Sequence, residues 1–182
     1  VCQLYEIDED ADGLFLTVEL LEGQPLSERL RQGALAPREA VPIALAVLGA
    51  LAALHQKGIV HRDLKPSNIF LSAHGVKLLD FGLARPLTSA ESAAESALTL
   101  PGVVFGTPTY MAPELLEGGT GDARSDLFAV GVALYEMLAG HAPFRGTTPF
   151  EVARAILQDE PPALGGSPGA GGLARGVGQA VP

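Results

Sequence analysis

The order of hydrophobic and polar positions changes along the chain, and these changes predict its strands and helices. Residues 1–22 have the character of strands, since the segment 14–18 (LFLTV) is apolar and partly β-branched and the turn-forming residues 10–13 (DADG) precede it. The simplest arrangement of this part is a β-hairpin. From Pro25 onward the pattern becomes helical.

The longest apolar run, at residues 40–54, predicts a long helix. Pro37, followed by an acid in the first turn, is typical of a helix start, and Gly58 is well placed to end the helix in a left-handed conformation. The helix is therefore expected over about residues 37–57. Because the run contains Pro42 and is short for a membrane span, we expect a buried core helix and no membrane segment in this chain.

The second half of the chain alternates between long loops and helices. Residues 83–109 lack apolar periodicity and are rich in Ser, Thr, Ala and Glu, which predicts a mobile surface loop. Residues 127–139 are apolar nearly all round, as in a central buried helix, and residues 148–159 form an amphipathic pattern. Pro and Gly dominate residues 161–182, so a disordered tail is expected there.

Composition limits the class of protein and its partners. Apolar residues make up 47% of the 182 residues, which is enough for one domain with a hydrophobic core. The formal net charge of −9 argues against nucleic acid or an anionic membrane as the main partner. Cys2 is the only cysteine, so no internal disulfide is possible and a reducing cytoplasm is the expected location. A membrane anchor in a longer parent protein stays open as an alternative.

Three short motifs, in a fixed order, indicate the chemistry. Residues 61–68 (HRDLKPSN), residues 80–82 (DFG) and residues 112–114 (APE), the last preceded by residues 106–111 (GTPTYM), resemble the catalytic loop, the metal-binding motif and the end of the activation segment of protein kinases. Any one of them could arise by chance, but their combination in this order is specific. The chain thus resembles a eukaryotic-like serine/threonine protein kinase of the bacterial type.

The resemblance implies an α+β, two-lobed protein-kinase fold with a mostly helical large lobe. It assigns residues 1–18 to the last strands of the small lobe, residues 19–23 to the hinge and residues 24–160 to the large lobe. No segment resembles the glycine-rich loop or the lysine-bearing strand of the family, and the late helices of the family are not matched after residue 160. The resemblance therefore implies a partial catalytic domain, and we expect the 182 residues alone to transfer phosphate poorly.

Phosphoryl transfer needs a positioned nucleophile and neutralisation of the charge on the phosphate oxygens. The resemblance implies that Asp63 orients the substrate hydroxyl and accepts its proton, and that Asn68 and Asp80 hold Mg²⁺. It implies that Lys65 contacts the transferred phosphate, which favours Ser and Thr over Tyr as acceptors. Thr107 fits the position that holds the base and shapes the substrate pocket.

The nucleotide would be ATP, bound at residues 18–23 (VELLEG), which resemble the hinge between the lobes. In the family the adenine forms hydrogen bonds with the hinge backbone, here at Glu19 and Leu21. Val18 takes the gatekeeper position, and Phe70 would form the apolar floor of the pocket. An ordinary strand end is the simpler alternative for this segment.

Several further residues are expected to be structural. His61 would pack under Phe81 in a hydrophobic stack that Leu4 also joins, and Glu114 would pair with an arginine late in the domain. Asp126 resembles the buried aspartate that holds the catalytic loop from below. The three remaining histidines show no metal-ligand spacing, and surface or capping roles are expected for His55, His74 and His141.

The loop after residue 82 is a candidate site of regulation. Arg62 directly precedes Asp63, and kinases with this arginine are commonly activated by phosphorylation of the activation loop, because a phosphate can pair with the arginine and order the loop. We favour Thr99, from its distance to Gly106. The other candidates in this loop are Thr88, Ser89, Ser92 and Ser96.

The sequence leaves open two other classes of protein and a third possibility, that the chain has no function of its own. A pseudokinase would keep the fold as a binding module without catalysis, although all the catalytic residues of the large lobe are present. A small-molecule kinase would share the base and metal ligands, although the activation segment indicates a protein substrate. The chain could also be a fragment of a longer reading frame.

Overall fold

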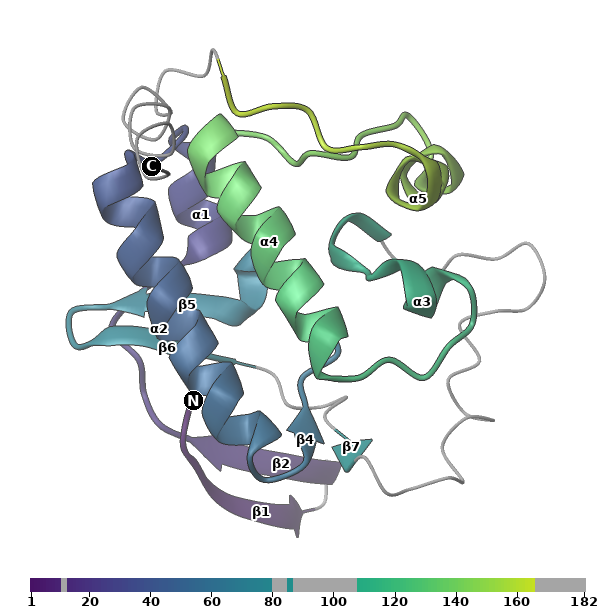
Figure 1. Ribbon diagram of the computed structural model, residues 1–182. Helices are drawn as coiled ribbons and strands as arrows, with labels where there is room; N and C mark the ends of the chain where they lie inside the picture. Colours follow the sequence, from purple (N-terminus) through teal and green to yellow (C-terminus); the bar gives the residue numbers. More distant parts are fainter. Residues whose placement is uncertain (11–12, 80–84, 87–107, 166–182) are drawn as a thin grey trace, which may run out of the picture.

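The computed structural model describes residues 1–10, 13–79, 85–86 and 108–165 (Figure 1). The chain begins with an antiparallel hairpin of β1 (Leu4–Asp10) and β2 (Gly13–Val18). Gly13 has φ 123°, a conformation that only glycine adopts readily, so the predicted turn has the residue that its geometry requires. The expected hairpin is confirmed.

A second small sheet lies directly after the segment expected to be the hinge. It has the strand order β3-β5-β6, all antiparallel, with bounds β3 (Gly23–Pro25), β5 (Ile69–Ser72) and β6 (Gly75–Leu78). The sequence pattern predicted a helical region from Pro25 and missed β3, because a strand of three residues is too short to show an alternation. The third pair joins β4 (Ile59–Val60) to β7 (Arg85–Pro86).

Two long helices form the centre of the fold, α2 (Pro37–His55) and α4 (Ala123–Ala139). They lie side by side and antiparallel (Figure 1). The start of α2 therefore meets the end of α4, where the amide of Leu35, just before α2, donates to the carbonyl of Met137 at 2.6 Å. The shorter elements are α1 (Leu26–Arg31), α3 (Pro113–Leu116), α5 (Pro149–Gln158) and the 3₁₀ turns η1 (Pro66–Asn68) and η3 (Pro108–Tyr110).

The ends of the helices follow the local chemistry. Gly58 has φ 70° just past α2, as predicted, and Gly140 ends α4 in the same left-handed conformation. The helix α4 begins at residue 123, four positions before the expected start, because Asp122 accepts from the Arg124 amide at 2.7 Å and Ser125 accepts from the Asp122 amide at 3.2 Å. This capping box was not read from the sequence.

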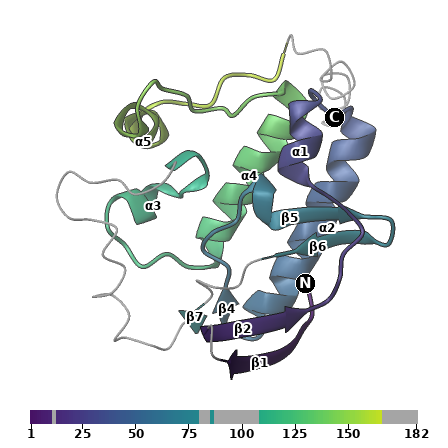
Figure 2. The same cartoon turned by 180° about the vertical axis from the view of Figure 1, so that it is seen from behind.

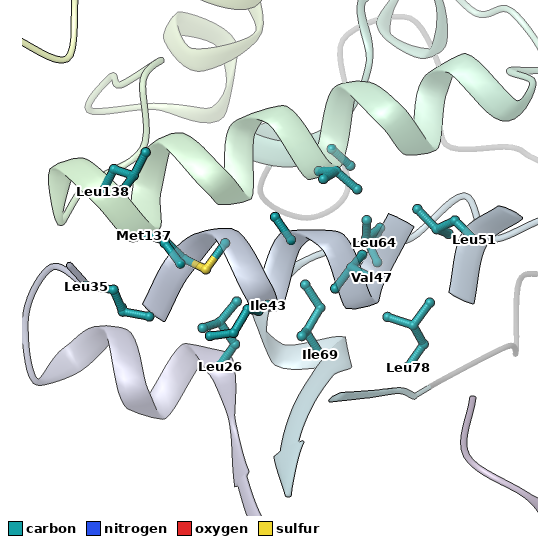
Figure 3. Packing of buried hydrophobic residues seen from close by; sticks show 14 of the residues in the cluster. Leu26, Leu35, Ile43, Val47, Leu51, Leu64, Ile69, Leu78, Met137 and Leu138 are labelled. Carbon is teal, nitrogen blue, oxygen red and sulfur yellow. The ribbon is translucent and has the colours of Figure 1, made fainter. Parts of the chain in front are cut away.

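The main core forms where α2, α4 and the β5–β6 hairpin meet. Figure 3 shows Val47 and Leu51 of α2 close to Ile69 and Leu78 of the hairpin, and all four are nearly or fully buried. Each such side chain contributes about 1.5–3 kcal/mol through removal of apolar surface from water. Seen from behind, the hairpin lies across α2, with β1 and β2 next to it (Figure 2).

The helix α2 has 19 residues and a mean hydropathy of 1.5, so it is long and apolar enough to cross a membrane by length and composition. Within the fold it instead supplies core side chains that pack on α4 and β6. One face of α2 thus belongs to the core, whereas Val41 and Leu45 on its other face are exposed, so the helix is less buried than expected.

Gly23 is a position where the fold has no room for a side chain. It has φ 145°, and a Cβ placed on it would lie 2.0 Å from the Leu71 carbonyl oxygen of the paired strand β5. Gly23→Ala is therefore expected to lower the free energy of unfolding by about 3 kcal/mol, since both the backbone strain and the clash act against it. Urea unfolding of the chain measures this loss.

The matched control is Gly49→Ala, inside α2, where a Cβ would meet nothing within 4 Å. This change is expected to raise the free energy of unfolding by about 0.5–1 kcal/mol, because alanine is the better helix former. Equal effects of the two substitutions would contradict the close approach of β3 to β5.

Candidate active site

The buried carboxylate of Asp126 fixes the backbone of the HRD segment. It lies in the first turn of α4, and the residue is 1% exposed. Its Oδ2 accepts from the His61 amide at 2.9 Å, and its Oδ1 accepts from the Arg62 amide at 2.9 Å. The expectation that Asp126 holds the catalytic loop from below is confirmed.

His55 joins the same network, which the sequence did not reveal. Its Nε2 lies 2.8 Å from Asp126 Oδ2, so the last residue of α2 contacts the first turn of α4. The expected surface or capping role is therefore wrong for His55. No local signal could have found this contact, because 71 positions separate the two residues in the chain.

Arg62 has a left-handed backbone conformation, which the hydrogen bonds to Asp126 stabilise. Its φ is 65°, and it is the one non-glycine residue with a positive φ in the described ranges. Such a backbone is unfavourable for a long side chain and persists only where the surroundings hold it, here through the two amide bonds to Asp126. Within the described part of the chain, Arg62 Nε is buried without a hydrogen-bond partner.

The next residues form a compact polar cluster. Lys65 Nζ donates to Asp63 Oδ2 at 2.7 Å, and the Asn68 amide nitrogen donates to the Asp63 carbonyl at 2.8 Å and to Asp63 Oδ2 at 3.2 Å. The side chains of Asp63 and Lys65 are 36% and 41% exposed, whereas Asn68 is buried. The cluster therefore places one carboxylate and one ammonium group at the surface, oriented by a buried amide.

The amide of Asn68 is oriented by these bonds. Since the Asn68 nitrogen donates to Asp63, its oxygen Oδ1 faces other groups, and within the described residues it accepts from Ser67 Oγ at 3.4 Å. The Asn68 carbonyl accepts from the Leu79 amide at 2.8 Å, which brings the end of the segment 75–79 beside the catalytic loop. An amide oxygen that accepts only the one long hydrogen bond from Ser67 within the described residues is of a type that suits a hard cation such as Mg²⁺.

Several predicted site residues lie outside the described residues. Among the described residues no group of three or more His, Cys, Asp or Glu side chains could hold a metal ion, and Asp80, the other expected ligand, is not among them. His61 is fully buried, and its Nε2 lies 3.2 Å from the Leu79 carbonyl. Also outside the description are Phe81, Thr107, Thr88, Ser89, Ser92, Ser96, Thr99 and the side chain of Leu4.

Residues 18–23, which the sequence predicts to be the hinge, have backbone groups without a partner in the described part of the chain. The Glu19 amide donates to the Gln3 carbonyl at 2.9 Å, but in the described part of the chain neither the Glu19 carbonyl nor the Leu21 amide has a hydrogen-bond partner. Val18 is 51% exposed, and the ring of Phe70 lies beside Gly23, where a Cβ would be 3.1 Å from Phe70 Cε1. An unpaired acceptor and donor thus lie near a partly exposed apolar surface.

A cavity of about 210 Å³ opens next to the catalytic loop, lined by Ser27, Leu30, Lys65, Pro66, Ser67, Tyr110 and Glu136. The Tyr110 hydroxyl donates to Glu136 Oε2, and burial followed by this hydrogen bond raises the pKa of Tyr110 far above its ordinary value. The hydroxyl therefore stays protonated, and Glu136 is the acidic group of the cavity wall.

Glu114 has a different partner from the one expected. Ser125 Oγ donates to Glu114 Oε1 at 2.5 Å, which ties the APE segment to the first turn of α4. The expected arginine partner is not found among the described residues. A larger cavity of about 570 Å³ lies beside Glu114 and Arg124, away from Asp63 and Lys65.

The HRD segment is thus anchored to α4, and Asp63, Lys65 and Asn68 are brought together in the loop that follows it. The protein kinase domain family matches residues 1–162, and the chain belongs to that family. The predicted family and the α+β kinase-like fold are confirmed. The reaction of this family uses ATP, typically with a divalent metal ion.

Three curated relatives are bacterial serine/threonine-protein kinases. The chain is 42% identical over 161 residues to PknL of Mycobacterium tuberculosis (strain CDC 1551 / Oshkosh), a match that covers 87% of this chain and 39% of PknL. It is 42% identical to pkn2 of Myxococcus xanthus, over 82% of this chain and 18% of that protein. It is 36% identical to PrkC of Bacillus subtilis (strain 168), over 90% of this chain and 24% of PrkC. The chain thus spans well under half the length of these relatives.

Proposed function

We propose that this chain forms the catalytic large lobe and hinge of a protein kinase that transfers the γ-phosphoryl group of ATP to Ser or Thr. The observation that carries the proposal is the cluster of Asp63, Lys65 and Asn68, held in place through Asp126. Catalysis of phosphoryl transfer is mainly positioning and charge stabilisation, and this cluster supplies both at a partly exposed surface. We place residues 1–18 in the small lobe, 19–23 in the hinge and 24–160 in the large lobe.

Each residue of the cluster has a role that follows from its hydrogen bonds. Oδ2 of Asp63 accepts from Lys65 and Asn68, which leaves Oδ1 to orient the acceptor hydroxyl and take its proton. Lys65 is close enough to the same carboxylate to stabilise negative charge on the transferred phosphate. Thr107 would support this loop from the activation segment.

The nucleotide and metal ion have matching groups on the chain. The Glu19 carbonyl and Leu21 amide would pair with the adenine edge, between Val18 and Phe70. Asn68 Oδ1 and the carboxylate of Asp80, which follows Leu79 directly, would hold Mg²⁺. When bound, the metal supplies charge neutralisation for the phosphate oxygens.

The acceptor would be a protein segment, since the cavity between Lys65 and Glu136 lies open beside the proposed base. The relatives' names specify Ser and Thr, and Lys65 agrees with that class of acceptor.

Acidic residues outnumber basic ones, so nucleic acid is not proposed as a partner. The need for ATP and the free thiol of Cys2 favour the cytoplasm.

The test uses a PknL fusion, in which the residues of PknL that precede its matched region are joined before Val1. With labelled ATP and Mg²⁺, this fusion is expected to phosphorylate a generic basic protein on Ser or Thr. Phosphoamino-acid analysis of the product identifies the acceptor. A stable, monodisperse fusion that binds ATP without transferring phosphate would instead support a pseudokinase.

We also propose that phosphorylation of the loop after residue 82 regulates the enzyme, with Thr99 as the main site. This proposal is supported by Arg62, because its buried Nε lacks a partner within the described residues and could bind a phosphate. After incubation of the PknL fusion with ATP, mass spectrometry is expected to find phosphate on Thr99, with Ser96 and Thr88 as secondary sites. Thr99→Ala should lower turnover about tenfold or more. A fully active fusion with unmodified Thr99 would contradict this choice.

A further inference from the structure

Three segments that are distant in sequence meet at the side chain of Glu19. Lys77 Nζ of β6 donates to Glu19 Oε1 at 2.6 Å, and the Gln3 amide donates to Glu19 Oε2 at 2.9 Å. The Glu19 amide in turn donates to the Gln3 carbonyl, and the Cys2 amide donates to the Leu78 carbonyl at 2.9 Å. Both carboxylate oxygens of Glu19 are therefore used, one by each flanking segment.

This junction lies beside the surface proposed to bind adenine. Lys77 is directly opposite Phe70 in the β5–β6 register, and residues directly opposite in an antiparallel pair extend to the same face of the sheet. Lys77 thus lies next to the ring that would form the floor of the adenine pocket. The side chains of Lys77 and Glu19 are 30% and 19% exposed, so the pair is partly shielded from water.

The hinge is attached to the same β5–β6 hairpin at both of its ends. At residue 23 it enters β3, where Gly23 pairs with Ser72 and Pro25 pairs with Phe70. At Glu19 the attachment is the ion pair with Lys77. Leu20, between these two points, is 92% exposed, so the intervening segment has little packing of its own. Its distance from Phe70 is therefore set by the two attachments.

We propose that the Glu19–Lys77 ion pair is a positioning pair that fixes the hinge backbone over Phe70 and thereby sets nucleotide affinity. The inference rests on the proposed function, because it assumes that the Glu19 carbonyl and Leu21 amide bind adenine. The pair acts through the hinge backbone and touches neither the phosphates nor the acceptor. Its loss should therefore raise the KM for ATP and leave kcat nearly unchanged.

Both partners are charged at neutral pH. The hydrogen bond from Lys77, followed by that from the Gln3 amide, lowers the pKa of Glu19 below its ordinary 4.5, and the bond to Glu19 raises the pKa of Lys77. A carboxyl with a lowered pKa in the folded state loses its contribution only as the pH falls through that lowered value. Measurements near pH 7.5 therefore test the pair in its charged form.

The first experiment needs no nucleotide. Amide hydrogen exchange is measured on the 182-residue chain for peptides that cover residues 1–3 and 18–23. Lys77→Met keeps the apolar stem and removes the charge, and it should speed exchange in both peptides about tenfold. The matched control is Lys57→Met, at an exposed lysine outside the junction, which should leave both peptides unchanged.

The second experiment measures ADP affinity and steady-state kinetics in the PknL fusion. Lys77→Met and Glu19→Gln should each raise the Kd for ADP and the KM for ATP about three- to tenfold. The control for Glu19 is Glu28→Gln, at an exposed acid of α1. The exchanged pair, Glu19→Lys with Lys77→Glu, should recover part of the affinity, which a general packing role of either side chain would not.

The outcomes separate this inference from the proposed function. If Lys77→Met matches Lys57→Met in both exchange and Kd, the positioning role is overturned while the proposed function stands. If hinge exchange rises but the unsubstituted fusion binds no ADP, the assignment of the hinge to adenine is overturned, and with it both proposals. Equal losses in kcat and kcat/KM would overturn the inference by showing that the pair acts on the transfer step.

Discussion

Asp126→Ala is expected to cost the chain about 3–5 kcal/mol in free energy of unfolding, as for the loss of one partner from a buried charged network. The substitution removes the acceptor for the His61 and Arg62 amides and for His55, and each buried polar group left unpaired costs about 1–3 kcal/mol. The positive φ of Arg62 also loses the bonds that hold it. Urea unfolding followed by circular dichroism measures the change.

The matched control for Asp126 is Asp122→Ala, at the N-cap of the same helix, four residues earlier. Asp122 caps α4 and pairs with Arg124 at the surface, so its loss should cost far less. Asp126→Asn keeps the shape but turns one acceptor into a donor that faces backbone amides, so it should fall near the alanine variant. An Asp126→Ala variant no less stable than Asp122→Ala would contradict the anchoring role.

In the PknL fusion, Asp63→Asn is expected to lower kcat by about 100-fold or more, the usual contribution of a positioned base. The change leaves an amide that is unable to accept the hydroxyl proton, while the side chain keeps its size. The KM for ATP should change little, because Asp63 is remote from the hinge in the proposed assignment. Initial rates with labelled ATP over a range of substrate concentrations measure both constants.

Two controls make the Asp63 result specific. Asp159→Asn, at an exposed position just after α5, should leave turnover unchanged. The unfolding curve of the Asp63→Asn fusion should match that of the unsubstituted protein, since the Asp63 side chain is 36% exposed and its pairing with Lys65 is at the surface. A kcat within about threefold of the unsubstituted value would exclude Asp63 as the base.

The sequence predicted those parts of the fold whose signals are local. The hairpin of residues 4–18 follows from β-branched residues around a turn, and the α2 helix follows from Pro37 at its start and Gly58 beyond its end. The predicted α5 differs from the observed helix by one residue at each end, because Thr148 is its N-cap and Asp159 its C-cap. These elements depend on residues that are close in sequence, so the amino-acid sequence is enough to predict them.

The local signals failed where an element was short or its boundary depended on distant residues. The strand β3 has no periodicity and exists because Gly23 permits a close approach to Leu71. The start of α4 at residue 123 depends on the capping box, whose Ser125 also binds Glu114 of another segment. The presence of β3 and the start of α4 therefore depend on contacts that only the folded chain forms.

The sequence by itself determined the family of this protein and the identity of its candidate catalytic residues, because phosphoryl transfer requires particular side chains at fixed spacing in one loop. Asp63, Lys65 and Asn68 could be read in this way. Only the tertiary structure decided what supports them: His55 at Asp126, and Lys77 at Glu19. These pairs lie 71 and 58 positions apart, and a hydrogen bond between two polar side chains imposes no pattern on the residues between them.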